Sequence, residues 1–219
     1  MKKNVSIIGG ADGPTAIFVA GRKEKNLLKR IKIAFLNRQY KRKRALAEKS
    51  IIPDAHTLEE VIHYIQQRYD AVEADCPYPY YLSKKRSMKY NLIKRLNPKL
   101  LGEEKQILPP ADFNDRQAVS EWQQQIDAWI KECQEKTDAV SYEVFPTDYH
   151  LFIINKGNLG SLEVEMDTLH PTLSISYSGD HKIMQSILKD IYLYFGVSKE
   201  DIDRRTERYT SLLSALTFN

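Results

Sequence analysis

Apolar residues recur at helix-like spacing through most of the N-terminal half of the chain. They predict a helix within residues 22–49, either continuous or broken near Asn37. A second helix is expected after Thr57, because Thr57 and Glu60 have the spacing of a capping box. A third helix is expected over residues 83–96. The N-terminal half is therefore predicted to be mainly helical.

The hydrophobic pattern changes to period two after about residue 140. Strands are expected at residues 142–145, 150–155, 162–166 and 172–177. Helices are expected at residues 115–136, 180–194 and 198–215, with Asp180 as the N-cap and Gly196 as the C-cap of the second one. Strands and helices do not alternate as they do in βαβ units, so the predicted class is α+β. We expect a small antiparallel sheet with flanking helices, one of which carries Trp122 and Trp129 on a broad buried face.

Residues 103–114 contain Pro109 and Pro110 and predict a linker. The expected division is a basic, mainly helical region over residues 1–102 and an α+β domain over residues 115–219. The first region is expected to begin with a strand at residues 4–10, a glycine-rich turn and a helix that starts at residues 12–15.

Charge is distributed unevenly between the two halves. Residues 1–102 carry 22 Lys and Arg against 9 Asp and Glu, a net charge of +13. Residues 103–219 carry 11 against 20, a net charge of −9. This asymmetry indicates either an anionic partner or neutralisation of one half by the other.

Composition also excludes several classes of protein. Cys76 and Cys133 are too few and too far apart for a disulfide framework or a zinc site. No apolar run approaches the roughly 18 residues of a membrane span, so we expect no membrane span and a cytoplasmic location. No cofactor motif, metal-ligand spacing or catalytic motif is recognisable, so no cofactor, metal ligand or catalytic residue is assigned.

The N-terminal segment carries one distinctive motif. Its residues are Gly9, Gly10, Asp12, Gly13, Pro14 and Thr15, within the sequence IIGGADGPTAIF at residues 7–18. This segment resembles part of the beta subunit of sodium-translocating decarboxylases of the oxaloacetate type. The resemblance implies that Asp12 is the counterpart of an acidic residue that takes part in sodium handling. A tight glycine turn, an anion site and a recognition tag read by another protein are the alternatives.

Basic residues interleaved with tyrosines are the remaining functional signal. The candidate contact residues are Arg38, Lys41, Arg42, Lys43, Arg44, Lys84, Lys85, Arg86, Tyr80 and Tyr81. Lysine and arginine neutralise phosphates, and tyrosine rings stack on unpaired bases. The prediction is a non-enzymatic binding protein that presents basic helices to nucleic acid or to an acidic protein. The alternatives are solvated helix faces without a ligand, or a small enzyme with a cleft near His150.

Overall fold

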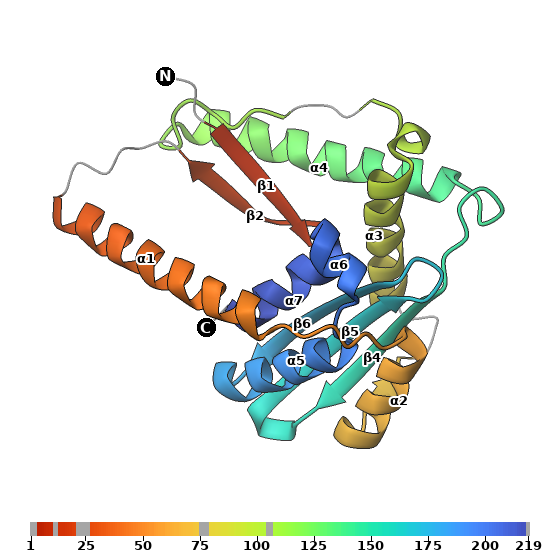
Figure 1. Cartoon of the computed structure of the whole chain (residues 1–219). Coiled ribbons are helices and arrows are strands. Elements are labelled where there is room, and N and C mark those ends of the chain that lie inside the picture. Colours follow the sequence, from red (N-terminus) through yellow and green to blue (C-terminus); the bar gives the residue numbers. More distant parts are fainter. Residues whose placement is uncertain (1–3, 11–12, 21–26, 75–78, 104–106, 218–219) are drawn as a thin grey trace. The chain divides into compact units, whose positions relative to one another are not determined.

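The chain forms an α+β structure that divides into two units. The computed structural model describes residues 4–10, 13–20, 27–74, 79–103 and 107–217 (Figure 1). Unit 1 contains residues 1–22 and 75–149, and unit 2 contains residues 23–74 and 150–219. Each unit combines segments from both sides of residues 103–114. The division therefore does not follow the boundary that the sequence predicts there.

The N-terminal motif lies in a β-hairpin of unit 1. Strand β1 (Asn4–Gly10) pairs antiparallel with β2 (Gly13–Ala20), with an irregularity between Ile8 and Gly9. The predicted helix start is therefore wrong from residue 13 onward. Thr15, Ile17 and Val19 supply β-branched residues at alternate positions, which favours a strand. Asp12 lies outside the described residues.

The other elements of unit 1 are mainly helical. They are α3 (Pro79–Leu96), the short 3₁₀ helix η1 (Pro98–Leu101) and α4 (Arg116–Ala139). Helix α4 begins where it was predicted to begin, and Asp115 is its N-cap, because Asp115 Oδ1 accepts hydrogen bonds from the amides of Gln117 at 3.0 Å and Ala118 at 3.2 Å.

Two expectations for unit 1 are wrong, namely the broad buried face with Trp122 and Trp129 and the strand at residues 142–145. Trp122 and Trp129 are only partly buried, and Thr137 is the buried residue of α4 among those described. Helix α4 packs mainly against α3 and η1, and these elements cover only part of its apolar face. Residues 142–145 form turns rather than a strand, because the Phe145 amide donates locally to Ser141 O at 3.1 Å.

Unit 2 is built on a four-stranded sheet. The strands are β3 (Val72–Glu73), β4 (Tyr149–Asn155), β5 (Gly160–Asp167) and β6 (Thr172–Gly179), in the order β3-β4-β5-β6. The pairs β3–β4 and β5–β6 are antiparallel, which agrees with the predicted sheet. Strand β3 was not predicted, because two residues carry no periodic pattern.

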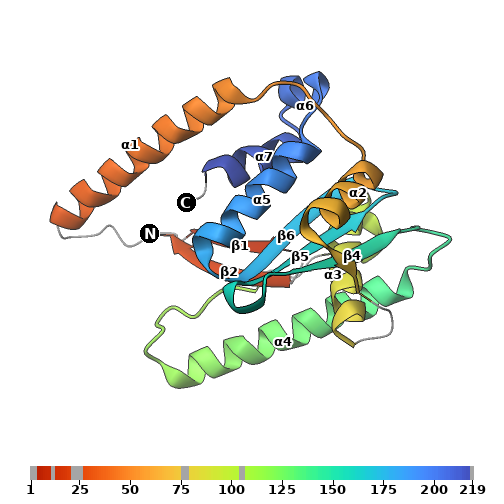
Figure 2. The same ribbon diagram turned by 90° about the horizontal axis from the view of Figure 1, so that it is seen from below.

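Helices α2 (Leu58–Tyr69) and α5 (His181–Phe195) lie side by side on one face of this sheet (Figure 2). The core combines Val61 and Ile65 of α2 with Leu162 and Val164 of β5 and Met184 of α5, all at 0% exposure. The predicted capping box is confirmed by hydrogen bonds between Thr57 and Glu60 in both directions. The capping box thus determines where α2 begins, and the apolar side chains of α2 pack against the sheet.

Asp190 of α5 joins the two helices through polar contacts. Its Oδ2 accepts a hydrogen bond from Tyr69 OH at 2.6 Å and a second one from Tyr64 OH. Arg68 Nε lies 3.2 Å from the same oxygen. Burial, reinforced by the hydrogen bond to Asp190, raises the pKa of both Tyr64 and Tyr69. Both phenols therefore stay protonated and remain donors at neutral pH.

The end of the chain forms two helices rather than the single one expected over residues 198–215. They are α6 (Lys199–Arg204) and α7 (Glu207–Thr217). Arg205 separates them with a φ of 50°, in the left-handed region. A left-handed residue ends α6, and Glu207 then begins the next helix.

Gly196 ends α5, as predicted, at a very close backbone contact. It has a φ of 61°, and a Cβ atom at this position would lie 1.6 Å from Asp54 O. The neighbouring chain is held there by hydrogen bonds from Asp54 N to Val197 O at 2.9 Å and from His56 N to Phe195 O at 3.0 Å. Only glycine fits this junction.

We predict that Gly196→Ala lowers the free energy of unfolding by at least about 3 kcal/mol, because residues 54–56 must move away from α5. Gly157→Ala is the matched control: Gly157 has a φ of 60° but faces open space. Its cost is limited to about 1–2 kcal/mol of left-handed backbone strain. Urea denaturation of both variants measures the difference, and equal losses would contradict the steric argument.

Candidate functional site

The largest concentration of positive charge lies on α1 (Leu27–Ser50) in unit 2. This helix contains nine Lys and Arg and one acidic residue, Glu48. Its sequence is rich in Leu, Ala, Lys and Arg, which are strong helix formers, and it is continuous through Asn37. No helix among the described residues is long and apolar enough to cross a membrane.

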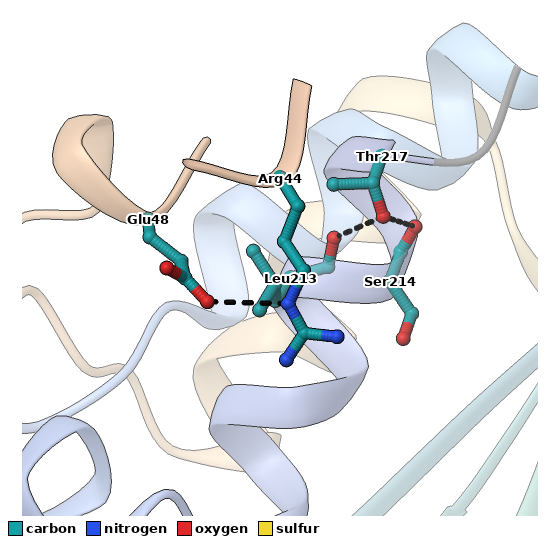
Figure 3. A network of polar contacts seen from close by, with 5 residues as sticks. All are labelled: Arg44, Glu48, Leu213, Ser214 and Thr217. Carbon is teal, nitrogen blue, oxygen red and sulfur yellow. Dashed lines mark hydrogen bonds and ion pairs between the residues drawn. The ribbon is translucent and has the colours of Figure 1, made fainter. Parts of the chain in front are cut away.

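The C-terminal end of α1 packs against α7. Ala47 and Ile51 contact a small core that contains Tyr209, Leu212 and Leu213. Arg44 Nε donates to Glu48 Oε1 at 3.2 Å, and this hydrogen bond raises the pKa of Arg44. Figure 3 shows this pair next to α7. The remainder of α1 leads away from this contact (Figure 1).

Thr217 closes the last turn of α7 at the same place. Its Oγ1 donates to Leu213 O at 2.8 Å and lies 3.2 Å from Ser214 O (Figure 3). These bonds satisfy carbonyl groups that a helix end otherwise leaves without partners. The surface on which α1 rests is therefore held by polar as well as apolar contacts.

We define the α1 cation cluster as Arg38, Lys41, Arg42 and Lys43. All four residues are exposed, whereas Arg44 is partly buried and paired with Glu48. Arg38, Lys41 and Arg42 have no ion pair or hydrogen bond within the part of the chain that the structure describes. The structure thus brings four of the predicted contact residues together on one exposed helix.

Large apolar side chains are exposed on the same helix. Ile31 and Phe35 are each 59% exposed, and Leu46 is 69% exposed. Their spacing places them on one side of α1, away from Ala47. Leu36 and Tyr40 are also exposed. A charged helix with this much uncovered apolar surface has the character of an interaction surface.

The predicted contact residues on α3, in unit 1, have different environments. Tyr81 is buried and its OH donates to Tyr149 O at 3.0 Å. Lys84 is also buried, with its Nζ 5.4 Å from the centre of the Tyr80 ring. Neither Tyr81 nor Lys84 is available to a partner, because tertiary packing covers both side chains. This corrects the expectation that they are contacts.

The remaining α3 candidates are accessible to different extents. Lys85 and Tyr80 are exposed. Arg86 is partly buried, and its Nε donates to Asp138 Oδ1 at 2.8 Å. Of the predicted contact residues on α3, only Lys85 and Tyr80 are therefore exposed, and Lys94 and Arg95 are exposed further along the same helix.

His150 was the centre of the alternative enzymatic interpretation. Its Nδ1 lies 2.7 Å from Glu73 Oε1, so a carboxylate is within reach. His150 does not line either of two cavities formed by the described residues, one in each unit. In the same part of the chain, no group of three His, Cys, Asp or Glu side chains is placed to hold a metal ion.

The larger of these cavities is a groove of about 500 Å³ in unit 2, which the sequence did not predict. Strand β6 contributes Ile175 and Tyr177 to its lining, and α5 and α7 contribute the other residues. The four α5 positions recur at helical spacing, but their mixed polar and apolar character gave no recognisable signal. They are His181, Gln185, Leu188 and Tyr192.

Comparisons with protein-family models, with curated proteins and with solved structures gave no match. The resemblance of residues 7–18 to the decarboxylase beta subunit stays a prediction. Any functional argument for this chain must therefore come from its own geometry.

We predict that Ala47→Glu lowers the free energy of unfolding by about 1–3 kcal/mol, because it places a carboxylate against the apolar core shared with α7. Ala45→Glu makes the same charge change on the exposed side of α1 and is expected to stay within about 0.5 kcal/mol of the parent. Urea midpoints measure both effects. An equal loss in the two variants would contradict the packing of α1 on α7.

Proposed function

We propose that this chain is a binding protein that presents α1 to an anionic macromolecular partner. The observation that carries the proposal is the α1 cation cluster: four exposed cations within six residues of one helix. At 1.5 Å per residue this cluster spans only about 8 Å along the helix axis. Such a density of positive charge attracts anions and speeds their association.

The charge of α1 is unfavourable for the helix alone. Arg38 is three residues from Lys41 and four from Arg42, and like charges at these spacings destabilise a helix by about 0.2–0.5 kcal/mol per pair. An anionic partner removes this repulsion. Binding is therefore expected to stabilise α1 as well as to neutralise it, which is a favourable term for complex formation.

Two classes of partner fit the charge of α1. Nucleic acid offers a regular array of phosphates, and Phe35 and Tyr40 are exposed aromatic rings on which bases can stack. An acidic protein offers carboxylates, and its apolar residues can cover Ile31 and Leu46 as well. The two classes differ in how their binding depends on salt and on the apolar side chains.

The test compares the full-length protein with the variant Arg38→Gln/Lys41→Gln/Arg42→Gln by fluorescence anisotropy. The probes are a labelled single-stranded DNA, an RNA of the same sequence and labelled poly-L-glutamate. For nucleic acid, log Kd is expected to change steeply with log salt, and removal of three phosphate contacts is expected to reduce the slope by about 3. Poly-L-glutamate binding is also expected to weaken in the variant.

Lys182→Gln/Lys199→Gln/Arg205→Gln is the matched control, because it removes three exposed cations outside α1. This control is expected to leave the salt slope close to that of the parent. If neither nucleic acid nor poly-L-glutamate binds at low salt, the proposal is wrong. It is also wrong if both triple variants lose binding equally, since net charge rather than α1 would then explain the result.

A further inference from the structure

Strand β6 is an edge strand with an exposed groove beside it. It pairs with β5 along its whole length and has no neighbouring strand on its other side within the described residues. The backbone groups on that other side would be left to water or to a partner. An unpaired strand edge is a template for adding another strand.

The register shows which backbone groups lie on this free edge. The hydrogen bond from Asp180 N to Leu159 O, at 2.7 Å, continues the β5–β6 ladder. Because bonded residues alternate in an antiparallel pair, the even-numbered residues of β6 bond to β5. The odd-numbered residues Leu173, Ile175 and Tyr177 therefore direct their N–H and C=O groups towards the free edge.

Tyr192 of α5 confirms this direction, because its OH donates to Leu173 O at 3.3 Å. Burial raises the pKa of Tyr192 to about 12, although a hydrogen bond with the backbone of Ile175 lowers it in part. The phenol therefore keeps its proton at neutral pH. At one end of the β6 edge, the Tyr192 hydroxyl thus donates to the backbone in the way that an N–H group of an added strand would. The carbonyl of Ile175 and both backbone groups of Tyr177 have no partner among the described residues.

The groove of about 500 Å³ lies alongside these unpaired groups. Its lining combines β6, α5 and α7, and the apolar part is formed by Ile175, Leu188, Tyr192 and Ala215. The volume is within the range of sites that enclose a ligand. Side chains of a strand added next to β6 would enter this groove at every second position, because strand side chains alternate between two faces.

We infer that the β6 edge and this groove form a binding site for an extended peptide segment of a partner protein, which adds to the sheet as a fifth strand. The peptide pairs antiparallel with β6, forms backbone hydrogen bonds with Ile175 and Tyr177, and places alternate apolar side chains in the groove. The residues of this site do not include α1, so the inference does not rest on the proposed binding of an anionic partner.

The two ends of the groove differ in charge, and this difference indicates which charged residues the peptide carries near its own ends. Lys182 lies at the N-terminal end of α5, next to the lining residue His181 and beside the end of β6. Glu207 lies near the other end of α5, because its neighbour Arg208 donates to Gly196 O at 2.8 Å. An antiparallel peptide with an acidic residue near its N-terminus and a basic residue near its C-terminus matches these charges.

A single peptide fits the groove better than a second copy of this chain. Helix α7 forms one wall of the groove through Thr210, Ser211 and Ser214. A second copy would bring its own β6 together with the α7 that borders it, and the two α7 helices would compete for the space beside the paired strands. An isolated extended segment has no such obstruction.

The test uses a fluorescein-labelled octapeptide with the sequence Asp-Val-Thr-Val-Thr-Val-Thr-Lys and the full-length protein. One derivative carries N-methyl groups on the valine amides, which would face β6, and the matched derivative carries them on the threonine amides, which would face away. Loss of the hydrogen bonds to β6 is expected to weaken binding about tenfold or more for the first derivative. The second derivative is expected to bind as tightly as the parent peptide.

Two serine variants test the groove itself. Ser211→Phe fills the space beside α7 and is expected to weaken octapeptide binding about tenfold, whereas Ser186→Phe adds the same ring to an exposed position of α5 outside the groove lining. The second variant is expected to bind like the parent. Hydrogen exchange of the Tyr177 amide provides an independent measurement, and the octapeptide is expected to slow that exchange.

Several results would overturn the inference. Absence of octapeptide binding at about 1 mM, or equal binding of both N-methyl derivatives, excludes strand addition as the mode of recognition. A Tyr177 amide that is already protected without peptide, independently of protein concentration, shows that another segment of this chain covers the edge. Protection that rises with protein concentration shows that a second copy covers it.

Discussion

The structure of unit 2 depends on the junction at the end of α5, where three chain segments share a few backbone groups. Gly196 allows residues 54–56 to pass at a distance that no side chain would permit. Arg208 then joins this junction from α7, with Nε donating to Gly196 O at 2.8 Å and Nη2 to His56 O at 2.8 Å. Burial lowers the pKa of Arg208, with an opposing contribution from Asp201, but a guanidinium remains charged at neutral pH. This one side chain therefore joins the first turn of α7 to the end of α5 and to residue 56.

Local sequence signals predicted the elements whose ends are determined by neighbouring residues. The caps at Thr57 and Asp180, the start of α4 at Asp115 and the glycine at Gly196 all lie where the sequence placed them. In each case a side chain or a glycine satisfies backbone groups within three or four residues. The segment from Gly13 was misinterpreted for a related reason: Pro14 suits the first turn of a helix, but pairing with β1 decides the conformation.

The candidate sites were predicted less completely, because exposure is a property of packing. Lys84 and Lys41 are both lysines in basic helices, yet Lys84 is buried and Lys41 is exposed. No local pattern distinguishes them. The β6 groove was missed altogether: its residues come from three elements, and the free edge of β6 follows from strand order rather than from the sequence of β6 itself.

Helix α7 connects the two proposed binding surfaces. Leu213 belongs to the core that α1 shares, and the adjacent Ser214 lines the groove beside β6. Successive residues of a helix point in directions about 100° apart, so one short helix can support α1 on one side and border the groove on another. A partner that binds α1 therefore binds a helix that rests on one wall of the groove. Because coupling between two sites is reciprocal, a peptide that prefers one position of α7 would also change the affinity of α1 for its anionic partner.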